Sequence, residues 1–324
     1  MIFFGCDGGS TKAEFIITED TGKILAHNTF PGCNFARSGY DVFRQFIQNA
    51  IRKMCGMAGI QPDDITDSVF GLTAYGELES SEEIVPEVIC EILPKERVTV
   101  ANDAVIGWSG SMSGRPGINV VAGTGSIAYG EDESGNNARV GGWSLLFGDE
   151  GSCCWIGRHI LEIFFKQSDG RLPRTALYDV FREYFNLSKK DLYFIDILNH
   201  GFEEKRTNIA NLQLLAEKAY KKGDKTMKTL YSKAADELAE MAQTVKNQLS
   251  FRTSNSIQVS YSGGLFKSGD LVLTPFREKI EASGLTLVHP KYPPFIGALA
   301  IGARKHLNDA RLQDLLELVY KTID

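Results

Sequence analysis

The chain has 324 residues with ordinary contents of apolar (43%) and charged (23%) residues, and its formal net charge is −6. This length predicts about two domains, and the acidic balance argues against a dedicated nucleic-acid-binding protein. The N-terminus lacks the pattern of a signal peptide, and no apolar run reaches the roughly 18 residues of a membrane-spanning helix. We therefore expect a cytoplasmic protein with no membrane or nucleic-acid partner, whose six cysteines are reduced thiols.

The N-terminal residues have the pattern of a three-stranded antiparallel meander. Short apolar runs alternate with turns rich in glycine and acidic residues, which is typical of strands joined by hairpins. The runs cover residues 2–4, 13–17 and 23–26. Further along, apolar residues at helical spacing predict an amphipathic helix over residues 43–54. A strand near residues 98–100 then stops at Asn102 and Asp103.

The same order of elements returns about 115 residues later. The predicted strands here cover residues 118–122, 127–129 and 138–140. They surround a second glycine hairpin at residues 123–126, and a long amphipathic helix follows over residues 227–249. A strand over residues 257–261 ends at a third glycine turn that includes Gly264. This mixture predicts an α/β protein of two domains built on one plan, with the boundary in the turn at residues 113–117.

Both glycine hairpins offer backbone N–H groups and hydroxyls that suit phosphate oxygens, and the first adds a lysine. The candidate phosphate contacts are Gly9, Ser10, Thr11, Lys12, Thr124 and Gly125. Neither the P-loop pattern nor the GxGxxG pattern of dinucleotide-binding folds is present. For each hairpin taken alone, glycines that serve only the geometry of the turn remain the alternative.

Two carboxylates lie where strands are predicted to end. Asp103 follows a strand, at the place where open α/β sheets carry ligand-binding residues, and it can accept the proton of an attacking hydroxyl. Asp7 lies at the mouth of the first hairpin and suits a hydrated Mg²⁺ that accompanies a polyphosphate. The alternative for Asn102 and Asp103 is a plain helix cap.

The segment over residues 141–152 combines paired glycines, a tryptophan and acidic residues. Trp143 offers an apolar face to a sugar ring, and Asp149 can accept hydrogen bonds from a polyol. A stabilising charge at a helix N-terminus is the alternative for Asp149. For the adjacent Cys153 and Cys154, we expect two small residues at the start of a buried helix.

In their order along the chain, these motifs resemble the BadF/BadG/BcrA/BcrD ATPase family of the actin, sugar kinase and Hsp70 superfamily, and above all its N-acetylglucosamine kinase branch. The resemblance implies an α/β fold of two ribonuclease H-like domains (the actin/hexokinase-type ATPase fold) with an interdomain cleft. The domains would cover residues 1–115 and 116–306, and a helix over residues 307–323 would return to the first. ATP and Mg²⁺ would be the cofactors, a sugar the substrate, and a homodimer the assembly.

The resemblance also implies roles for single residues. Asp103 would take the proton of the sugar hydroxyl, and Asp7 would hold Mg²⁺ through water. The implied nucleotide contacts are Gly9, Ser10, Thr11, Lys12, Thr124, Gly125, Gly223, Gly264 and Ser268. The implied sugar contacts are Asn34, Asp103, Ser126, Gly142, Trp143 and Asp149.

The expected function is ATP-dependent phosphorylation of a hydroxyl, O6, of N-acetylglucosamine or a related amino sugar. Ser144 and Leu145 stand where family members often carry Gly and His, so glucosamine, N-acetylmuramic acid and glucose remain alternative substrates. A partner-driven ATPase switch is an alternative of another class. We do not expect an iron–sulfur activator, because the cysteine spacing of those relatives is missing, nor a sugar-sensing regulator, because the first predicted strand starts at Ile2 with no helix-turn-helix before it.

Overall fold

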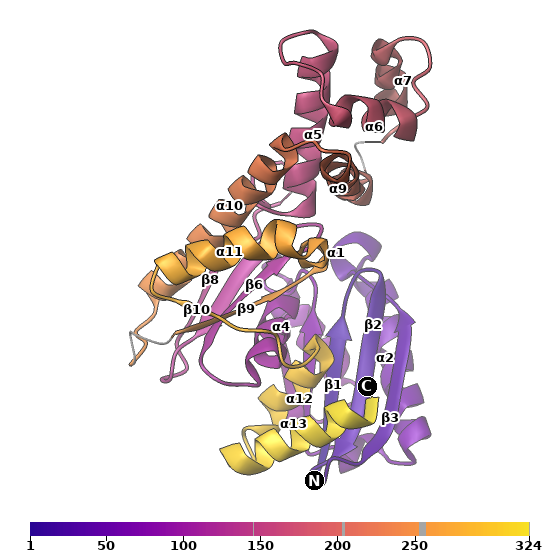
Figure 1. The fold of residues 1–324 in the computed structure, drawn as a ribbon. Helices are drawn as coiled ribbons and strands as arrows, with labels where there is room; N and C mark the ends of the chain where they lie inside the picture. The colour runs from indigo at the N-terminus through magenta and orange to yellow at the C-terminus, as the bar shows by residue number, and fades with distance from the viewer. Residues whose placement is uncertain (145, 203–204, 253–256, 324) are drawn as a thin grey trace. The chain divides into compact units, whose positions relative to one another are not determined.

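The computed structural model describes residues 1–144, 146–202, 205–252 and 257–323. The chain forms two units, Met1–Pro116 with the segment from His289 onward, and Gly117–Val288 (Figure 1). The change from one unit to the other at Pro116 lies inside the turn at residues 113–117. Within the described ranges, no helix combines the length and the apolar character needed to cross a membrane.

A five-stranded sheet in the order β3-β2-β1-β4-β5 forms the centre of the first unit. The strands are β1 (Ile2–Gly8), β2 (Lys12–Glu19), β3 (Ile24–Pro31), β4 (Asp67–Leu72) and β5 (Val98–Asn102). The first three strands pair antiparallel, which confirms the predicted meander, whereas β4 and β5 run parallel to β1. The carboxyl ends of β1, β4 and β5 therefore share one edge of the sheet.

Helices cover both faces of this sheet because its strands are apolar on both sides. The helices are α1 (Phe35–Ser38), α2 (Tyr40–Ala58), α3 (Ser81–Cys90), α4 (Asp103–Met112), α12 (Pro294–Ala303) and α13 (Asp309–Ile323), with short 3₁₀ turns at Pro62–Asp64 and Lys95–Arg97. Successive side chains of β1 point to opposite faces of the sheet and so belong to different cores. Phe4 belongs to the core beneath α2 and α3, and Phe3 belongs to the core beneath α12 and α13. The helix predicted over residues 43–54 is confirmed as part of α2.

The prediction assigned residues 289–306 to the second domain, and this assignment is corrected here. These residues belong to the first unit, where α12 lies against β1 (Figure 1). The reason is burial, since Phe295 and Leu299 of α12 pack with Phe3 and Ile16 of the sheet. The first unit is therefore built from two separate stretches of chain.

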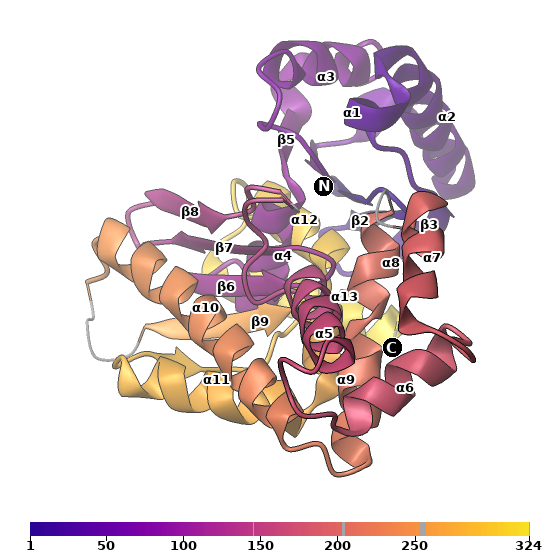
Figure 2. The ribbon, with the colours of Figure 1, turned by 90° about the horizontal axis from the view of Figure 1, so that it is seen from above.

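The second unit repeats the plan of the first. Its strands are β6 (Gly117–Ala122), β7 (Ser126–Glu131), β8 (Asn137–Gly141), β9 (Gln258–Ser262) and β10 (Thr286–Leu287). The order β8-β7-β6-β9-β10 again places a three-stranded meander beside two strands parallel to its first strand. Figure 2 shows β8, β7, β6 and β9 side by side in this order. The predicted repeat is confirmed.

Most helices of the second unit lie between β8 and β9 in the sequence. They are α5 (Cys153–Ser168), α6 (Ala176–Tyr184), α7 (Phe194–Asn199), α8 (Arg206–Asn211), α9 (Gln213–Lys221) and α10 (Thr226–Gln248), with a 3₁₀ turn at Asp191–Tyr193. A 3₁₀ turn at Gly264–Ser268 and the helix α11 (Asp270–Ala282) follow β9. The predicted helix over residues 227–249 is confirmed as α10, which packs on β6, β7 and β8. Stacked rings, among them Phe164 and Phe181, join α5 to α6.

Candidate functional site

In the first unit, candidate side chains meet at the carboxyl edge of the parallel strands. Asp7 lies near the end of β1, Thr73 directly follows β4, and Asp103 directly follows β5. The Thr73 backbone N–H donates to the Gly8 carbonyl at 3.1 Å, and its Oγ1 donates to Asp103 Oδ2 at 2.7 Å. The Asp103 carboxylate is thereby held at the edge where open α/β sheets bind ligands.

At the start of α4, Asn102 and Asp103 have different roles. Asn102 Oδ1 accepts from the Ala104 backbone N–H at 3.0 Å, and Asn102 Nδ2 donates to the Tyr75 carbonyl at 3.0 Å. Asn102 is therefore the N-cap, and Asp103 is the first helical residue. The helix does not need the Asp103 carboxylate as its cap, so the plain capping alternative explains Asn102 alone.

Asp7 is a carboxylate that the fold makes difficult to ionise. Its pKa is raised from 3.8 to about 7, first by burial and then by the negative charges of Asp103 and Glu14, while Lys12 acts in the opposite direction. Burial and like charges both disfavour the ionised form. A cation placed beside Asp7 would relieve this unfavourable charge. Among the described residues, no three His, Cys, Asp or Glu side chains form a protein-only metal cluster.

The first hairpin is closely packed from behind and exposed at its tip. A Cβ at Gly32 would collide with the Gly9 carbonyl and the backbone of Ser10, so only glycine fits behind the turn. Ser10, Thr11 and Lys12 are exposed. Lys12 Nζ donates to Glu14 Oε2 at 3.0 Å. Lys12 is thus in an ion pair in this structure, and its contact with phosphate stays a prediction.

Asn34 links the first hairpin to α1. Its Nδ2 donates to Ser10 Oγ at 3.0 Å, and its Oδ1 accepts from the Ala36 backbone N–H at 3.0 Å as the cap of α1. The predicted sugar contact Asn34 and the predicted nucleotide contact Ser10 are therefore direct neighbours.

In the second unit, the start of α5 is hydrogen-bonded to the second glycine hairpin at residues 123–126. The Cys153 N–H donates to the Gly123 carbonyl at 2.9 Å, and the Cys154 N–H donates to the Thr124 carbonyl at 3.3 Å. Burial raises the pKa of Cys153 to about 12 and that of Cys154 to about 11, so both remain thiols at neutral pH. The expectation of a buried helix start is confirmed.

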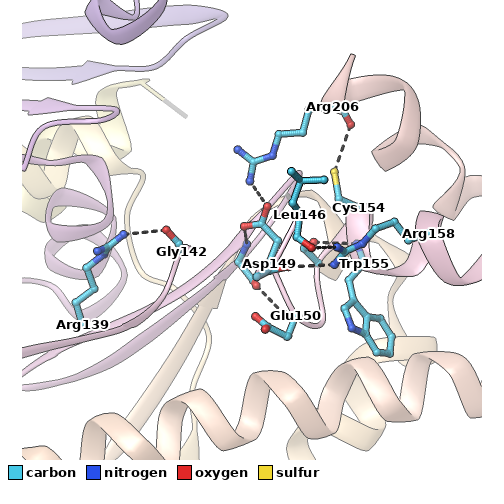
Figure 3. A network of polar contacts seen from close by, with 12 residues as sticks. Arg139, Gly142, Leu146, Asp149, Glu150, Cys154, Trp155, Arg158 and Arg206 are labelled. Carbon is cyan, nitrogen blue, oxygen red and sulfur yellow. Dashed lines mark hydrogen bonds and ion pairs between the residues drawn. The ribbon is translucent and has the colours of Figure 1, made fainter. Parts of the chain in front are cut away.

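Ser126 and Asp149 are both buried and make hydrogen bonds within this region. Figure 3 shows Asp149 paired with Arg206. Asp149 is 1% exposed, and its Oδ1 accepts from the Ser126 N–H at 3.3 Å while Oδ2 pairs with Arg206. Ser126 is also buried, and its hydroxyl donates to the Glu150 carbonyl at 2.6 Å. In this structure both side chains bind protein groups, and the sugar contacts assigned to them stay predictions.

The segment around Trp143 is held through its backbone and leaves its apolar side chains exposed. Arg139 donates to the Gly142 carbonyl at 3.1 Å, and Arg158 donates to the Leu146 carbonyl at 3.2 Å (Figure 3). Arg158 also donates to the Gly148 carbonyl at 3.0 Å. Trp143 is 75% exposed, so its ring is accessible for the predicted sugar contact. Leu145 lies outside the described residues.

A family model matches residues 4–302 of the chain. The chain belongs to the BadF/BadG/BcrA/BcrD ATPase family. It is 28% identical to an N-acetylmuramic acid/N-acetylglucosamine kinase from Clostridium acetobutylicum over 85% of this chain and 88% of that protein. It is 27% identical to an N-acetyl-D-glucosamine kinase from Dictyostelium discoideum over 94% of this chain and 99% of that protein.

Solved structures agree on the fold. The structure of a protein proposed to be an N-acetylglucosamine kinase, from Chromobacterium violaceum, superposes with a TM-score of 0.72 at 21% identity, over 93% of this chain and 98% of that chain. A glucokinase from Streptomyces griseus superposes with a TM-score of 0.51 at 18% identity, over 94% of this chain and all of that chain. The expected two-domain α/β fold of sugar kinases is therefore confirmed.

The third glycine turn of this BadF-type chain packs beside the second hairpin. Gly263 has φ +102°, and a Cβ there would collide with the Ala122 carbonyl, whereas a Cβ at Gly264 would meet no atom of the described residues within 4 Å. Ser268 Oγ donates to Glu217 Oε1 of α9 at 2.7 Å. Gly223 lies in the turn after α9, and the nucleotide contacts assigned to these residues stay predictions.

Sequence reasoning missed several polar residues that the structure places beside predicted ones. Three that we consider further are Thr73, Glu217 and Arg206. None lies in a glycine motif, and each reaches its partner from a distant part of the chain. Only Thr73 carried a usable signal, because it precedes a turn-rich stretch after a short apolar run.

Proposed function

We propose that this chain transfers the γ-phosphate of ATP to a hydroxyl, O6, of N-acetylglucosamine or a closely related amino sugar. The single observation that carries the proposal is the Asp103 carboxylate, which α4 does not use as its cap and which Thr73 holds at 2.7 Å. Two relatives that align over most of the chain are named as kinases of such sugars. We further propose a cytoplasmic homodimer.

In this proposal Asp103 is the general base. The sugar oxygen attacks the γ-phosphorus, a new O–P bond forms, and the bond to the bridging β,γ-oxygen breaks with its electron pair leaving on ADP. The sugar hydroxyl proton goes to Asp103. Phosphoryl transfer asks the protein chiefly for positioning and charge stabilisation, so Thr73 contributes by fixing the orientation of the carboxylate.

The remaining predicted residues bind and orient the reactants. The exposed hydroxyls of Ser10, Thr11 and Thr124 donate to phosphate oxygens. Asn34 and the exposed ring of Trp143 contact the sugar.

The surroundings of Asp7 fit Mg²⁺, because a carboxylate whose pKa is raised by burial and by Asp103 gains from a cation. Mg²⁺ prefers oxygen ligands and keeps several waters. When bound with ATP it neutralises charge on the phosphates.

The test is ADP release from Mg·ATP with a panel of N-acetylglucosamine, N-acetylmuramic acid, glucosamine, N-acetylmannosamine and glucose. We expect one N-acetylated sugar to stimulate turnover strongly. Asp103→Asn should lower kcat about 10²-fold or more while ATP still binds. Asp63→Asn, at an exposed position of a 3₁₀ turn, is the matched control and should be fully active.

Other outcomes point elsewhere. A response only to glucosamine or glucose would keep the kinase and change its substrate. ATP turnover that no sugar stimulates would favour a partner-driven switch. Full activity of Asp103→Asn would remove the general base from the proposal.

A further inference from the structure

Arg206, the first residue of α8, lies directly against the second glycine hairpin. Its Nη2 pairs with the buried carboxylate of Asp149 (Figure 3). A Cβ added to Gly125 would collide with this same Nη2 and with Asp149 Oδ1. The guanidinium therefore occupies the space beside Gly125 that any larger residue would fill.

Among the residues that the structure describes, this guanidinium has one donor without an acceptor. Its Nε is buried and finds no hydrogen-bond partner among them. The backbone of the same residue is held from the other side, because the Cys154 thiol donates to the Arg206 carbonyl at 3.3 Å. A buried donor left unpaired is costly. The guanidinium presents five N–H donors in a fixed plane that matches an anion with two or three oxygens. Asp149 accepts from one edge of the guanidinium, so an anion at another edge would supply acceptors for the remaining N–H donors.

We propose that Arg206 binds the γ-phosphoryl group of ATP and stabilises its charge during transfer. The inference rests on the proposed function, because it takes the second glycine hairpin at residues 123–126 as a phosphate site. Arginine is the side chain best suited to a planar contact with phosphate oxygens. Asp149 holds the guanidinium in place before the nucleotide arrives, so binding costs little side-chain reorganisation.

The decisive measurement compares two nucleotides that differ only at the γ position. Titration calorimetry gives the affinities of ADP and of the non-hydrolysable analogue AMPPNP, with Mg²⁺, for the wild type and for Arg206→Lys. Lysine keeps a positive charge for Asp149 but loses the planar fork. We expect the AMPPNP affinity to fall roughly 10-fold or more, since hydrogen bonds to charged groups are strong. The ADP affinity should change by less than about 3-fold, and kcat should fall about 10²-fold at an unchanged sugar KM.

A second variant guards against misfolding, because removing Arg206 alone leaves Asp149 buried without a partner. Asp149→Asn combined with Arg206→Gln removes both charges, and it should retain thermal stability but show the same selective loss of AMPPNP affinity. Arg277→Lys, in a surface pair with Glu281, is the matched control and should bind both nucleotides normally.

Three results would overturn the inference. Equal weakening of ADP and AMPPNP would mean that Arg206 only supports the hairpin. Unchanged AMPPNP affinity would remove it from the phosphate site. A defect confined to N-acetylmuramic acid would assign the guanidinium to the carboxylate of that sugar. Failure of the wild type to phosphorylate any sugar would defeat the proposed substrate, and the nucleotide comparison would still test Arg206.

Discussion

Asp7 binds its proton more tightly in the folded protein than in the unfolded chain. Its pKa is raised from 3.8 to about 7, with burial as the largest cause and Asp103 as the next. For an acid with a raised pKa, the folded state holds a proton that the unfolded chain has released. The stability from this proton is present below pH 4 and is lost as the pH rises through 7.

Replacing Asp7 by Asn should therefore change stability in a pH-dependent way. Each pKa unit corresponds to about 1.4 kcal/mol, and part of the charge is solvated. When the pH is raised from 4 to 8, the free energy of unfolding of the variant should therefore rise by roughly 2–4 kcal/mol relative to that of the wild type. Urea unfolding of both proteins at the two pH values measures this gain. A difference in stability that is the same at both pH values would contradict the raised pKa.

At this scale, the sequence predicts residues whose motif is local and misses those whose partner is distant. Asn102 and Asp103 follow a recognisable strand, and their position alone suggests a site. Thr73 and Arg206 become relevant only because the fold brings them to Asp103 and Asp149. The burial of Asp149 was equally inaccessible, because a loop carboxylate and a buried one look alike in sequence.

Among the elements of the first unit, α4 and α12 pack against each other closely. A Cβ at Gly297 would overlap the Ile106 carbonyl and the backbone of Gly110, and a Cβ at Gly110 would lie 2.7 Å from the Pro293 carbonyl. Both helices lie against β4, where Gly71 leaves room for the side chain of Ile106. The position of α4, and with it that of Asp103, thus depends on glycines at the crossing.

Two glycine-to-alanine changes in helices should have opposite effects. Gly297→Ala should destabilise the protein by about 1–3 kcal/mol or more, because the added methyl meets backbone that can move only with its helix. Gly56→Ala, at an exposed position of α2 where no atom of the described chain lies within 4 Å of the added Cβ, should stabilise it by about 0.5–1 kcal/mol through helix propensity. Denaturant midpoints of the two variants against the wild type decide this. A neutral Gly297→Ala would mean that the two helices separate easily.

Element prediction succeeded where a period was visible and failed where burial is complete. Both meanders and α2 carry alternation, glycine turns or a helical period. All residues of α12 after Pro294 are buried, so it shows no polar face from which a period could be recognised. The strand β4 begins with Asp67 and Ser68 and contains a glycine, and this composition resembles a turn.

At the scale of the whole molecule, the chain completes its first unit only after it has built the second. The segment from His289 onward supplies α12 and α13. The buried residues of α13 are Leu312, Leu315, Leu316 and Val319. Four buried aliphatic side chains represent roughly 6–12 kcal/mol of hydrophobic stabilisation. This is comparable to the net stability of a typical domain, about 5–15 kcal/mol.

Ending the chain after Asn308, which removes α13, should therefore unfold the first unit selectively. Hydrogen exchange followed by mass spectrometry should show peptides from residues 1–116 losing protection, while peptides from residues 117–288 keep theirs. The control variant Glu317→Gln with Lys321→Gln removes only a surface ion pair and should stay protected. Uniform loss of protection in both units, or none, would contradict independent cores.

The insertion of residues 117–288 within the first unit also sets an order of events during protein synthesis. A ribosome delivers the chain from its N-terminus, and domains generally fold as units once their residues have emerged. All five strands of the second sheet emerge before α12 does. The sheet that begins at the N-terminus thus waits, with Phe3 and Ile16 uncovered on one face, until the second unit has been translated. During that interval the nascent chain exposes an apolar surface of the kind that makes folding intermediates prone to aggregate and that chaperones cover.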